Sequence, residues 1–394
     1  MARRACVAAG CASAGFLFAG TVTKVASADT RDAAPPLWAG LVPGPHAVGF
    51  TVRAHLDPTR RLAAGGLRPV QISVWYPAVP ATGTALRYRD YLLVAAEEST
   101  LAPSADPAAV LDRYAGFLAR QGLPADAVEA WLDAPLAARR DATPTAGRFP
   151  LVLVAQGNGG AAPDQAVLAE LLAGHGFVVA TTPSPARLGF PMESDADVLP
   201  MARDQARDLR LALEALRGAP NVDASRVGLV GYSFGSRAAL LAAGLPGLRA
   251  LVSLDGGIGA ATAKGWLPLA ALRRRDLRVP ILHVYEEVEE FMRPDFTLLD
   301  SLVRAPQLRV KVAGMRHTDL ITFGVATAAL PQLAGGTEEG ARLAARIRAV
   351  SSYALWFLQA HLAGDHDAAR RLAVSPEAAG FGTGLLELQR RPPR

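Results

Sequence analysis

The chain has almost no cysteine. Its two cysteines, Cys6 and Cys11, both lie within the first 28 residues. The rest of the chain can therefore form no disulfide framework and no zinc site with cysteine ligands.

Those first 28 residues have the features of a signal peptide. Residues 1–4 carry positive charge, residues 5–22 are small and apolar, and residues 26–28 form an Ala-Ser-Ala cleavage box. We predict cleavage after Ala28 and export to the periplasm or the outside of a bacterium-like cell. An uncleaved membrane anchor and a lipoprotein acylated at Cys11 are alternatives that the composition favours less.

Basic clusters and long apolar runs are also scarce. Arg3, Arg4 and Lys24 supply three of the formal net charge of +5, so about +2 remains after residue 28. No basic run is interleaved with aromatic residues, and we expect no nucleic-acid partner. No later segment is apolar for long enough to span a bilayer, so we expect no stable membrane insertion after signal cleavage. Phosphate-loop and dinucleotide fingerprints are missing, and we expect neither a metal nor an organic cofactor.

Short apolar segments that alternate with helical patterns are abundant. This alternation is typical of a mostly parallel central sheet flanked by helices, and we predict one α/β domain over residues 29–394. The expected strands are 46–54, 70–76, 150–156, 176–181, 226–231, 250–255, 279–285 and 308–313. The expected helices include 165–173, 201–217, 296–303 and a long amphipathic helix over 338–362 that closes the fold.

Residues from about 86 to 145 interrupt this alternation. The segment is rich in Ala, Asp, Arg and Tyr, shows helical spacing over 110–120 and 126–132, and is too long for a plain connection. We predict a helical insertion over the carboxyl edge of the sheet, where ligand sites of α/β proteins occur. A helical excursion with no part in a site is the alternative.

A G-x-S-x-G pentapeptide carries most of the chemical information. An apolar strand runs from Arg226 into Gly-Tyr-Ser-Phe-Gly, and an Ala- and Leu-rich helix start follows. This context is that of a nucleophile elbow, a sharp turn that exposes the Ser233 hydroxyl. Gly231 and Gly235 must lack a Cβ for the strand and the helix to approach so closely. A glycine-rich structural turn is the alternative.

A serine needs a base to become a good nucleophile. Among the seven histidines, only His317 directly follows the last expected strand, and the chain order Ser, acid, His fits. We predict that His317 is the base. The other histidines have structural settings: before the sheet (His46, His55), in a helix-to-strand turn (His175), inside an apolar strand (His283), and on or beyond the last helix (His361, His366).

Two positions could supply the acid that orients the histidine. Asp255 ends the strand after the nucleophile's and is followed by glycines, which suits a buried carboxylate. Glu286 ends the next strand, but it belongs to an acidic run, 286–290, that is typical of a solvated face. We favour Asp255 and keep Glu286 as the alternative acid.

An oxyanion hole needs two backbone N–H donors. Phe234, directly after the nucleophile, should supply one, and Asn158 in the glycine-rich turn 156–160 should supply the other. A glycine-rich loop without this role is the alternative.

Several segments together resemble the branch of the α/β-hydrolases that includes platelet-activating-factor acetylhydrolases and dienelactone hydrolases. They are 69–77, 149–154, 156–159, 172–180, 231–235 and 253–255, with His317 where the family has its histidine. The resemblance implies an α/β-hydrolase fold, a triad of Ser233, Asp255 and His317, and an oxyanion hole from the amides of Asn158 and Phe234. Gln156 and Tyr232 depart from the histidines that the family commonly has at these places.

The motif and the resemblance together predict a serine hydrolase that cleaves small-molecule carboxylic esters through an acyl-enzyme. A serine peptidase on the same fold is an alternative, although no acidic pair is placed to bind a substrate amine. A hydrolase-fold binding protein with negligible turnover is another.

Overall fold

The computed structural model describes residues 34–394 except 63–64, 191, 193, 270–271, 273–275 and 289–291. The predicted signal segment, with Cys6 and Cys11, lies outside the described residues. None of the helices described is long and apolar enough to cross a membrane.

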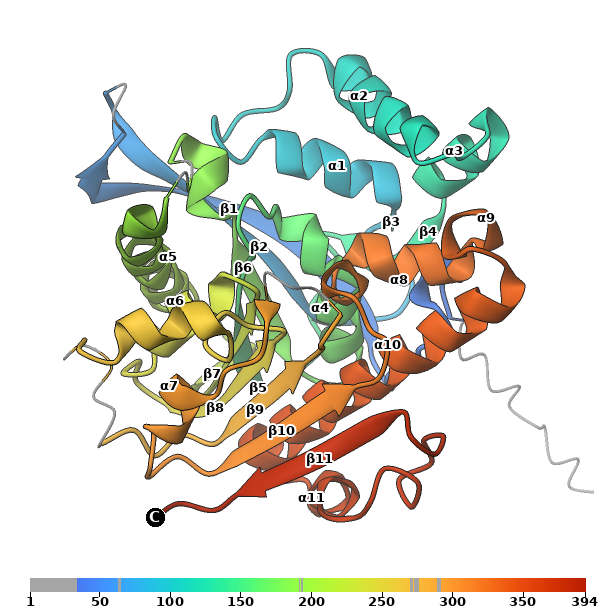
Figure 1. Cartoon of the computed structure of the whole chain (residues 1–394). Coiled ribbons are helices and arrows are strands. Elements are labelled where there is room, and N and C mark those ends of the chain that lie inside the picture. The colour runs from blue at the N-terminus through green and yellow to red at the C-terminus, as the bar shows by residue number, and fades with distance from the viewer. Residues whose placement is uncertain are drawn as a thin grey trace, which may run out of the picture. The chain divides into compact units, whose positions relative to one another are not determined.

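One mixed sheet organises the described residues from 34 to 394 (Figure 1). Its strand order is β11-β10-β9-β8-β7-β5-β6-β2-β1-β4-β3. The six strands from β10 to β6 pair in parallel, while β2, β1 and β11 join them by antiparallel pairing. The strands are β1 (Ala47–Arg61), β2 (Leu67–Ala78), β3 (Thr84–Arg87), β4 (Pro135–Arg140), β5 (Phe149–Ala155), β6 (Val178–Thr182), β7 (Val222–Tyr232), β8 (Leu248–Leu254), β9 (Ile281–Tyr285), β10 (Gln307–Val312) and β11 (Leu386–Arg391).

All eight expected strands are confirmed, as β1, β2 and β5 to β10. Three further strands, β3, β4 and β11, were not predicted; they lie at or next to the two edges of the sheet. These strands are short and have at most two buried positions each, so they lack the continuous apolar run that marks a doubly covered strand.

The main helices agree with the expectations except at the carboxyl end. The expected helix over 296–303 is a single turn, and the long helix over 337–358 does not close the fold. A π-helical turn (Gln359–Ala363), a further helix and β11 follow it, and β11 adds an edge strand to β10. The helices outside the insertion are α4 (Ala166–Gly174), α5 (Asp195–Leu216), α6 (Gly235–Leu241), α7 (Thr297–Asp300), α8 (Thr322–Ala329), α9 (Pro331–Ala334), α10 (Thr337–Leu358) and α11 (His366–Ala373).

Two hydrophobic cores cover the two faces of the sheet. Alternate residues of β5 point into different cores: Leu151 and Leu153 pack with α5 and α6, whereas Val152 and Val154 pack with α4, α8 and α10. All four side chains are buried. This double burial explains why the central strands have apolar residues at every position.

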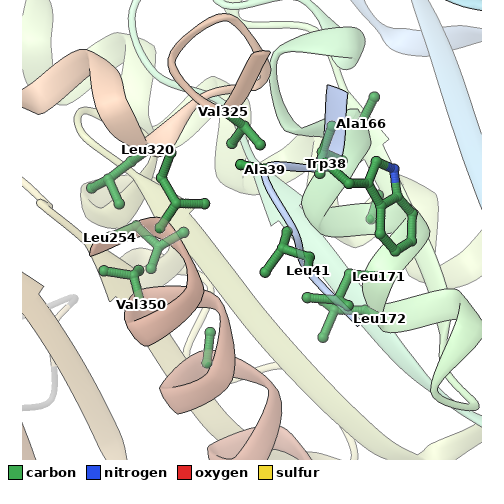
Figure 2. Close-up of a cluster of buried hydrophobic side chains, with 14 of the residues drawn as sticks. Trp38, Ala39, Leu41, Ala166, Leu171, Leu172, Leu254, Leu320, Val325 and Val350 are labelled. Atoms are coloured by element: carbon green, nitrogen blue, oxygen red, sulfur yellow. The ribbon is translucent and has the colours of Figure 1, made fainter. Parts of the chain in front are cut away.

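The core beneath α4 and α10 also fixes two loops at the carboxyl edge of the sheet. Leu254 ends β8, and Leu320 lies in the short 3₁₀ turn η7 (His317–Leu320) after β10. Both line one small cavity together with Val350 of α10 (Figure 2). The residues that follow Leu254 and precede Leu320 are therefore held against the same packed surface.

The insertion contains three helices, α1 (Tyr88–Ala96), α2 (Pro107–Arg120) and α3 (Ala125–Leu132). The prediction of a helical insertion is wrong at the two ends of the segment, where the chain forms strands. There β3 and β4 pair with each other, and β4 also pairs with β1. Phe117 and Trp131 of the insertion each contact Phe323 of α8, with ring centroids 5.5 Å apart. Glu98 accepts a hydrogen bond from the amide of Ala162, which follows β5, at 2.8 Å. The insertion thus touches segments that leave the carboxyl ends of β5 and β10.

A buried carboxylate in α4 ties the insertion to the core. Glu170 is fully buried and accepts hydrogen bonds from Trp38 Nε1 at 3.1 Å and the Tyr91 hydroxyl at 2.8 Å. It also accepts from the amides of Ala137 and Ala138 in β4, at 3.0 and 3.2 Å. Burial raises the pKa of Glu170 to about 7 because it outweighs the four donors, which favour the charged form.

This carboxylate should make stability depend on pH. The pKa of Glu170 is higher in the folded chain than its ordinary value of 4.5, so the folded chain holds the protonated carboxyl more tightly than the unfolded chain does. The resulting stabilisation of the fold is complete below pH 4.5 and is lost as the pH rises through about 7. Between pH 5 and 8 the free energy of unfolding should fall by about 2 kcal/mol more in the wild type than in Glu170→Gln. Urea titrations of both proteins measure this difference, and equal pH slopes would contradict it.

Candidate active site

The nucleophile elbow has the geometry that its glycines require. Ser233 follows β7 directly and has a left-handed φ of 52°. A Cβ on Gly231 would overlap the backbone of Ser236, and one on Gly235 would overlap the carbonyl of Ala155. The strand and helix α6 are therefore as close as the sequence pattern predicts, and the turn presents the Ser233 side chain at the carboxyl end of β7.

His317 reaches this serine from the turn after β10. Its Nε2 lies 2.9 Å from the Oγ of Ser233, and its Nδ1 lies 2.5 Å from the Oδ2 of Asp255. The short turn that carries His317 is capped by Asp319, whose carboxylate accepts the amide of Arg316 at 2.7 Å. The three residues that the sequence singled out, Ser233, Asp255 and His317, therefore form one hydrogen-bonded chain.

Asp255 lies in a tight turn directly after β8. It is 2% exposed, has a left-handed φ of 39°, and donates its amide to the carbonyl of Val284 at 2.8 Å. A Cβ on the next residue, Gly256, would overlap the Oγ of Ser253. The amide of Gly257 then donates to the carbonyl of Ser233 at 2.9 Å, so the acid turn and the elbow are bonded to each other.

Glu286, the alternative acid, is fully buried at the end of β9, and a carboxylate oxygen of Glu286 accepts the amide of Val288. The expectation of a solvated acidic face is therefore wrong at this position. The expectation of solvent exposure holds for the next residue, Glu287. Its side chain is half-exposed and forms an ion pair with Lys311 at 2.8 Å. The carboxyl end of β9 is covered, which the run of glutamates did not indicate.

The glycine-rich turn after β5 lies beside the serine. A Cβ on Gly157 would stand 3.4 Å from the Cβ of Ser233. Within the turn, the amide of Gly159 donates to the Oγ of Ser184 at 3.1 Å, and Asn158 is exposed. Phe234, which directly follows the serine, is buried. The turn that contains Asn158 thus lies against Ser233, and the strands that lead into this turn and into the elbow, β5 and β7, are neighbours in the sheet.

Gln156 supports this turn. Its side chain is buried, and its Nε2 donates to the Oγ1 of Thr181 in β6 at 2.9 Å. Its carbonyl accepts the side-chain amide of Gln205 in α5 at 3.0 Å. Strands β5, β6 and β7 meet here at the point where the strand order reverses, which is where open α/β sheets form ligand sites.

One residue of the site was not predicted. Tyr232 is buried, its hydroxyl donates to the backbone carbonyl of His317 at 3.1 Å, and its ring stacks on the imidazole with centroids 4.9 Å apart. The only indication in the sequence was that Tyr232 stands where the resembled family commonly has histidine.

Two histidines outside the triad have separate partners. His283 Nδ1 lies 3.0 Å from the Oγ of Ser253, and His175 Nδ1 lies 2.8 Å from the carbonyl of Leu171. Burial lowers the pKa of His283 to about 3, so its imidazole stays neutral. No group of three or more metal-ligating side chains occurs within the described parts of the chain.

This arrangement suits nucleophilic catalysis. A serine hydroxyl bonded to an imidazole, which is bonded in turn to a buried carboxylate, is the arrangement that activates serine for attack on a carbonyl. Neighbouring backbone amides could receive the charge that forms on the carbonyl oxygen.

The chain is similar to known proteins in part of its sequence and in its fold. Residues 137–314 match the family described as "Dienelactone hydrolase family". No curated protein sequence gives a significant match. Among solved structures, a ferulic acid esterase from Streptomyces cinnamoneus is similar, with a TM-score of 0.56 and 19% sequence identity. The similarity covers 87% of this chain and 96% of that one. The chain has an α/β-hydrolase fold, and its residues 137–314 are similar to the dienelactone hydrolase family.

Proposed function

We propose that the protein is an exported serine hydrolase that cleaves small-molecule carboxylic esters. The observation that carries the proposal is the continuous hydrogen-bonded chain from Ser233 through His317 to Asp255. Ser233 is the nucleophile, His317 acts first as base and then as acid, and Asp255 holds the imidazole in the required tautomer.

The reaction proceeds in two halves. His317 Nε2 takes the hydroxyl proton of Ser233 as the Oγ attacks the ester carbonyl, and the amides of Asn158 and Phe234 bind the developing oxyanion. His317 then gives that proton to the departing alcohol, which leaves an acyl-Ser233 ester. His317 then takes a proton from a water molecule as the water oxygen attacks this ester. It returns the proton to the Oγ of Ser233 as the bond to the acyl group breaks, which releases the carboxylic acid and regenerates the serine.

The insertion supplies a wall for the substrate. It contacts α8, which follows His317, and the segment after the oxyanion turn. We therefore expect it to limit the size of the acyl or alcohol group. Since a structurally similar protein is named a ferulic acid esterase, a ferulate ester belongs among the substrates to be tested.

Nitrophenyl esters of acetate, butyrate, octanoate and ferulate test this function, with the heat-unfolded protein as control. Saturable hydrolysis of at least one ester is expected. A matched set of peptide nitroanilides should be cleaved far more slowly, and the opposite order would favour a serine peptidase. Binding of the esters without turnover would favour a hydrolase-fold binding protein.

Export is proposed from the sequence of residues 1–28. The intact mass of the protein recovered outside the cytoplasm should correspond to a chain that begins at Asp29. A retained and acylated Cys11 would contradict the proposed cleavage and indicate a lipoprotein.

A further inference from the structure

The residue before the nucleophile makes two separate contacts with His317. The aromatic ring of Tyr232 lies over the imidazole at a centroid distance of 4.9 Å and an interplanar angle of 28°. Its hydroxyl donates to the His317 carbonyl at 3.1 Å, on the backbone of the same residue. Tyr232 therefore holds both the ring and the main chain of the histidine.

Tyr232 is itself held rigidly. It ends β7, its side chain is 7% exposed, and a Cβ on Gly157 would press against its ring at 2.9 Å. The glycine of the oxyanion turn thus leaves the space that the tyrosine ring occupies. Because an ordered ring can fix a neighbouring ring only if it cannot move away, this packing makes Tyr232 an effective support.

The stacking contact stabilises the protonated imidazole of His317 more than the neutral one. A cation over the face of an aromatic ring within about 6 Å is attracted by the ring's quadrupole, and the attraction grows when water is excluded. The imidazole of His317 is neutral before the reaction and becomes an imidazolium as it takes the serine proton. The contact with Tyr232 therefore strengthens as the transition state forms, which is the condition for an interaction to raise kcat.

We propose that Tyr232 is a positioning residue of the proposed ester hydrolase, which orients His317 and stabilises its imidazolium through the face of the phenol ring. This inference rests on the proposed function. It assigns the main effect to the ring and a smaller one to the hydroxyl, whose bond to a carbonyl has the modest net value of a neutral hydrogen bond.

Two substitutions at Tyr232 separate the ring from the hydroxyl. Tyr232→Phe keeps the stacked ring and should lower kcat for a nitrophenyl ester by about 3-fold. Tyr232→Leu removes the ring, the hydroxyl and the lateral support, and should lower kcat by about 30-fold. KM should change by less than about 3-fold in both variants, because the contact gains strength only in the transition state.

Tyr285→Leu is the matched control. Tyr285 also stacks on a histidine, with its centroid 5.8 Å from that of His283, but neither ring touches the triad in a described contact. This variant should keep kcat within about 3-fold of the wild type. Circular dichroism and stoichiometric labelling of Ser233 by a fluorophosphonate show whether each variant is folded with its site formed.

Several outcomes would overturn the proposal. Equal losses in Tyr232→Phe and Tyr232→Leu would assign the effect to the hydroxyl, and a change confined to KM would make Tyr232 a substrate contact. A folded Tyr232→Leu with wild-type kcat, or a variant that neither folds nor labels while Tyr232→Phe is unaffected, would leave Tyr232 as packing alone. A wild-type protein that hydrolyses no ester would instead overturn the proposed function, and the role of Tyr232 with it.

Discussion

Replacing His317 by alanine should lower kcat for ester hydrolysis by about 10⁵-fold or more while the protein stays folded. Nε2 of His317 is the basic atom bonded to the Ser233 hydroxyl, at 2.9 Å. Without it, neither the attack of the serine nor the departure of the alcohol has a proton carrier, and loss of the equivalent base in serine proteases has an effect of this size. Steady-state kinetics with the best nitrophenyl ester measure the loss.

His175→Ala is the control for this experiment. His175 is bonded to the carbonyl of Leu171 at the end of α4 and should contribute only to local packing. Its variant should turn over the ester at nearly the wild-type rate. A severe loss in His175→Ala, with activity retained in His317→Ala, would show that the base had been assigned wrongly.

Replacing Asp255 by asparagine should lower kcat by about 10⁴-fold. The buried carboxylate accepts from Nδ1 of His317 at 2.5 Å and so keeps the proton off Nε2, where the serine proton must be taken up. An amide at this place can donate to Nδ1 and favour the wrong tautomer, which has a cost of this size in serine proteases. The pH dependence of kcat should be recorded as well, to separate a tautomer effect from a shifted optimum.

Glu286→Gln separates the two candidate acids. Glu286 is as deeply buried as Asp255, so both variants place an amide where a buried carboxylate stood. The carboxylate of Glu286 accepts the amide of Val288, a local bond that Gln can keep. We expect its kcat to fall by less than about 10-fold. A severe loss in Glu286→Gln and a mild one in Asp255→Asn, with both proteins folded, would move the acid to β9.

The central strands and the elbow could be predicted because the residues within each of these segments determine its structure. A strand buried on both faces needs apolar residues throughout, as β5 has, and an elbow needs glycines two residues either side of its serine. The edge strands β3, β4 and β11 were missed because pairing with a neighbour stabilises them, and their own residues alternate or are polar.

Burial and side-chain contacts across the sheet were the parts that the sequence did not indicate. A run of glutamates predicts solvent exposure, yet Glu286 at the end of β9 is fully buried. The contacts of Tyr232 with His317 join residues 85 positions apart, and only the fold brings them together. The serine, the acid and the histidine were easier to find because each follows directly after a strand.

Covalent labelling of the serine tests the central claim most directly. The wild-type protein should react with one equivalent of a fluorophosphonate, lose its esterase activity in proportion, and carry the added mass on the peptide that contains Ser233. Ser233→Ala should remain unlabelled and inactive while its circular dichroism is unchanged. Label on another residue, or undiminished hydrolysis by Ser233→Ala, would contradict the serine mechanism proposed for this fold.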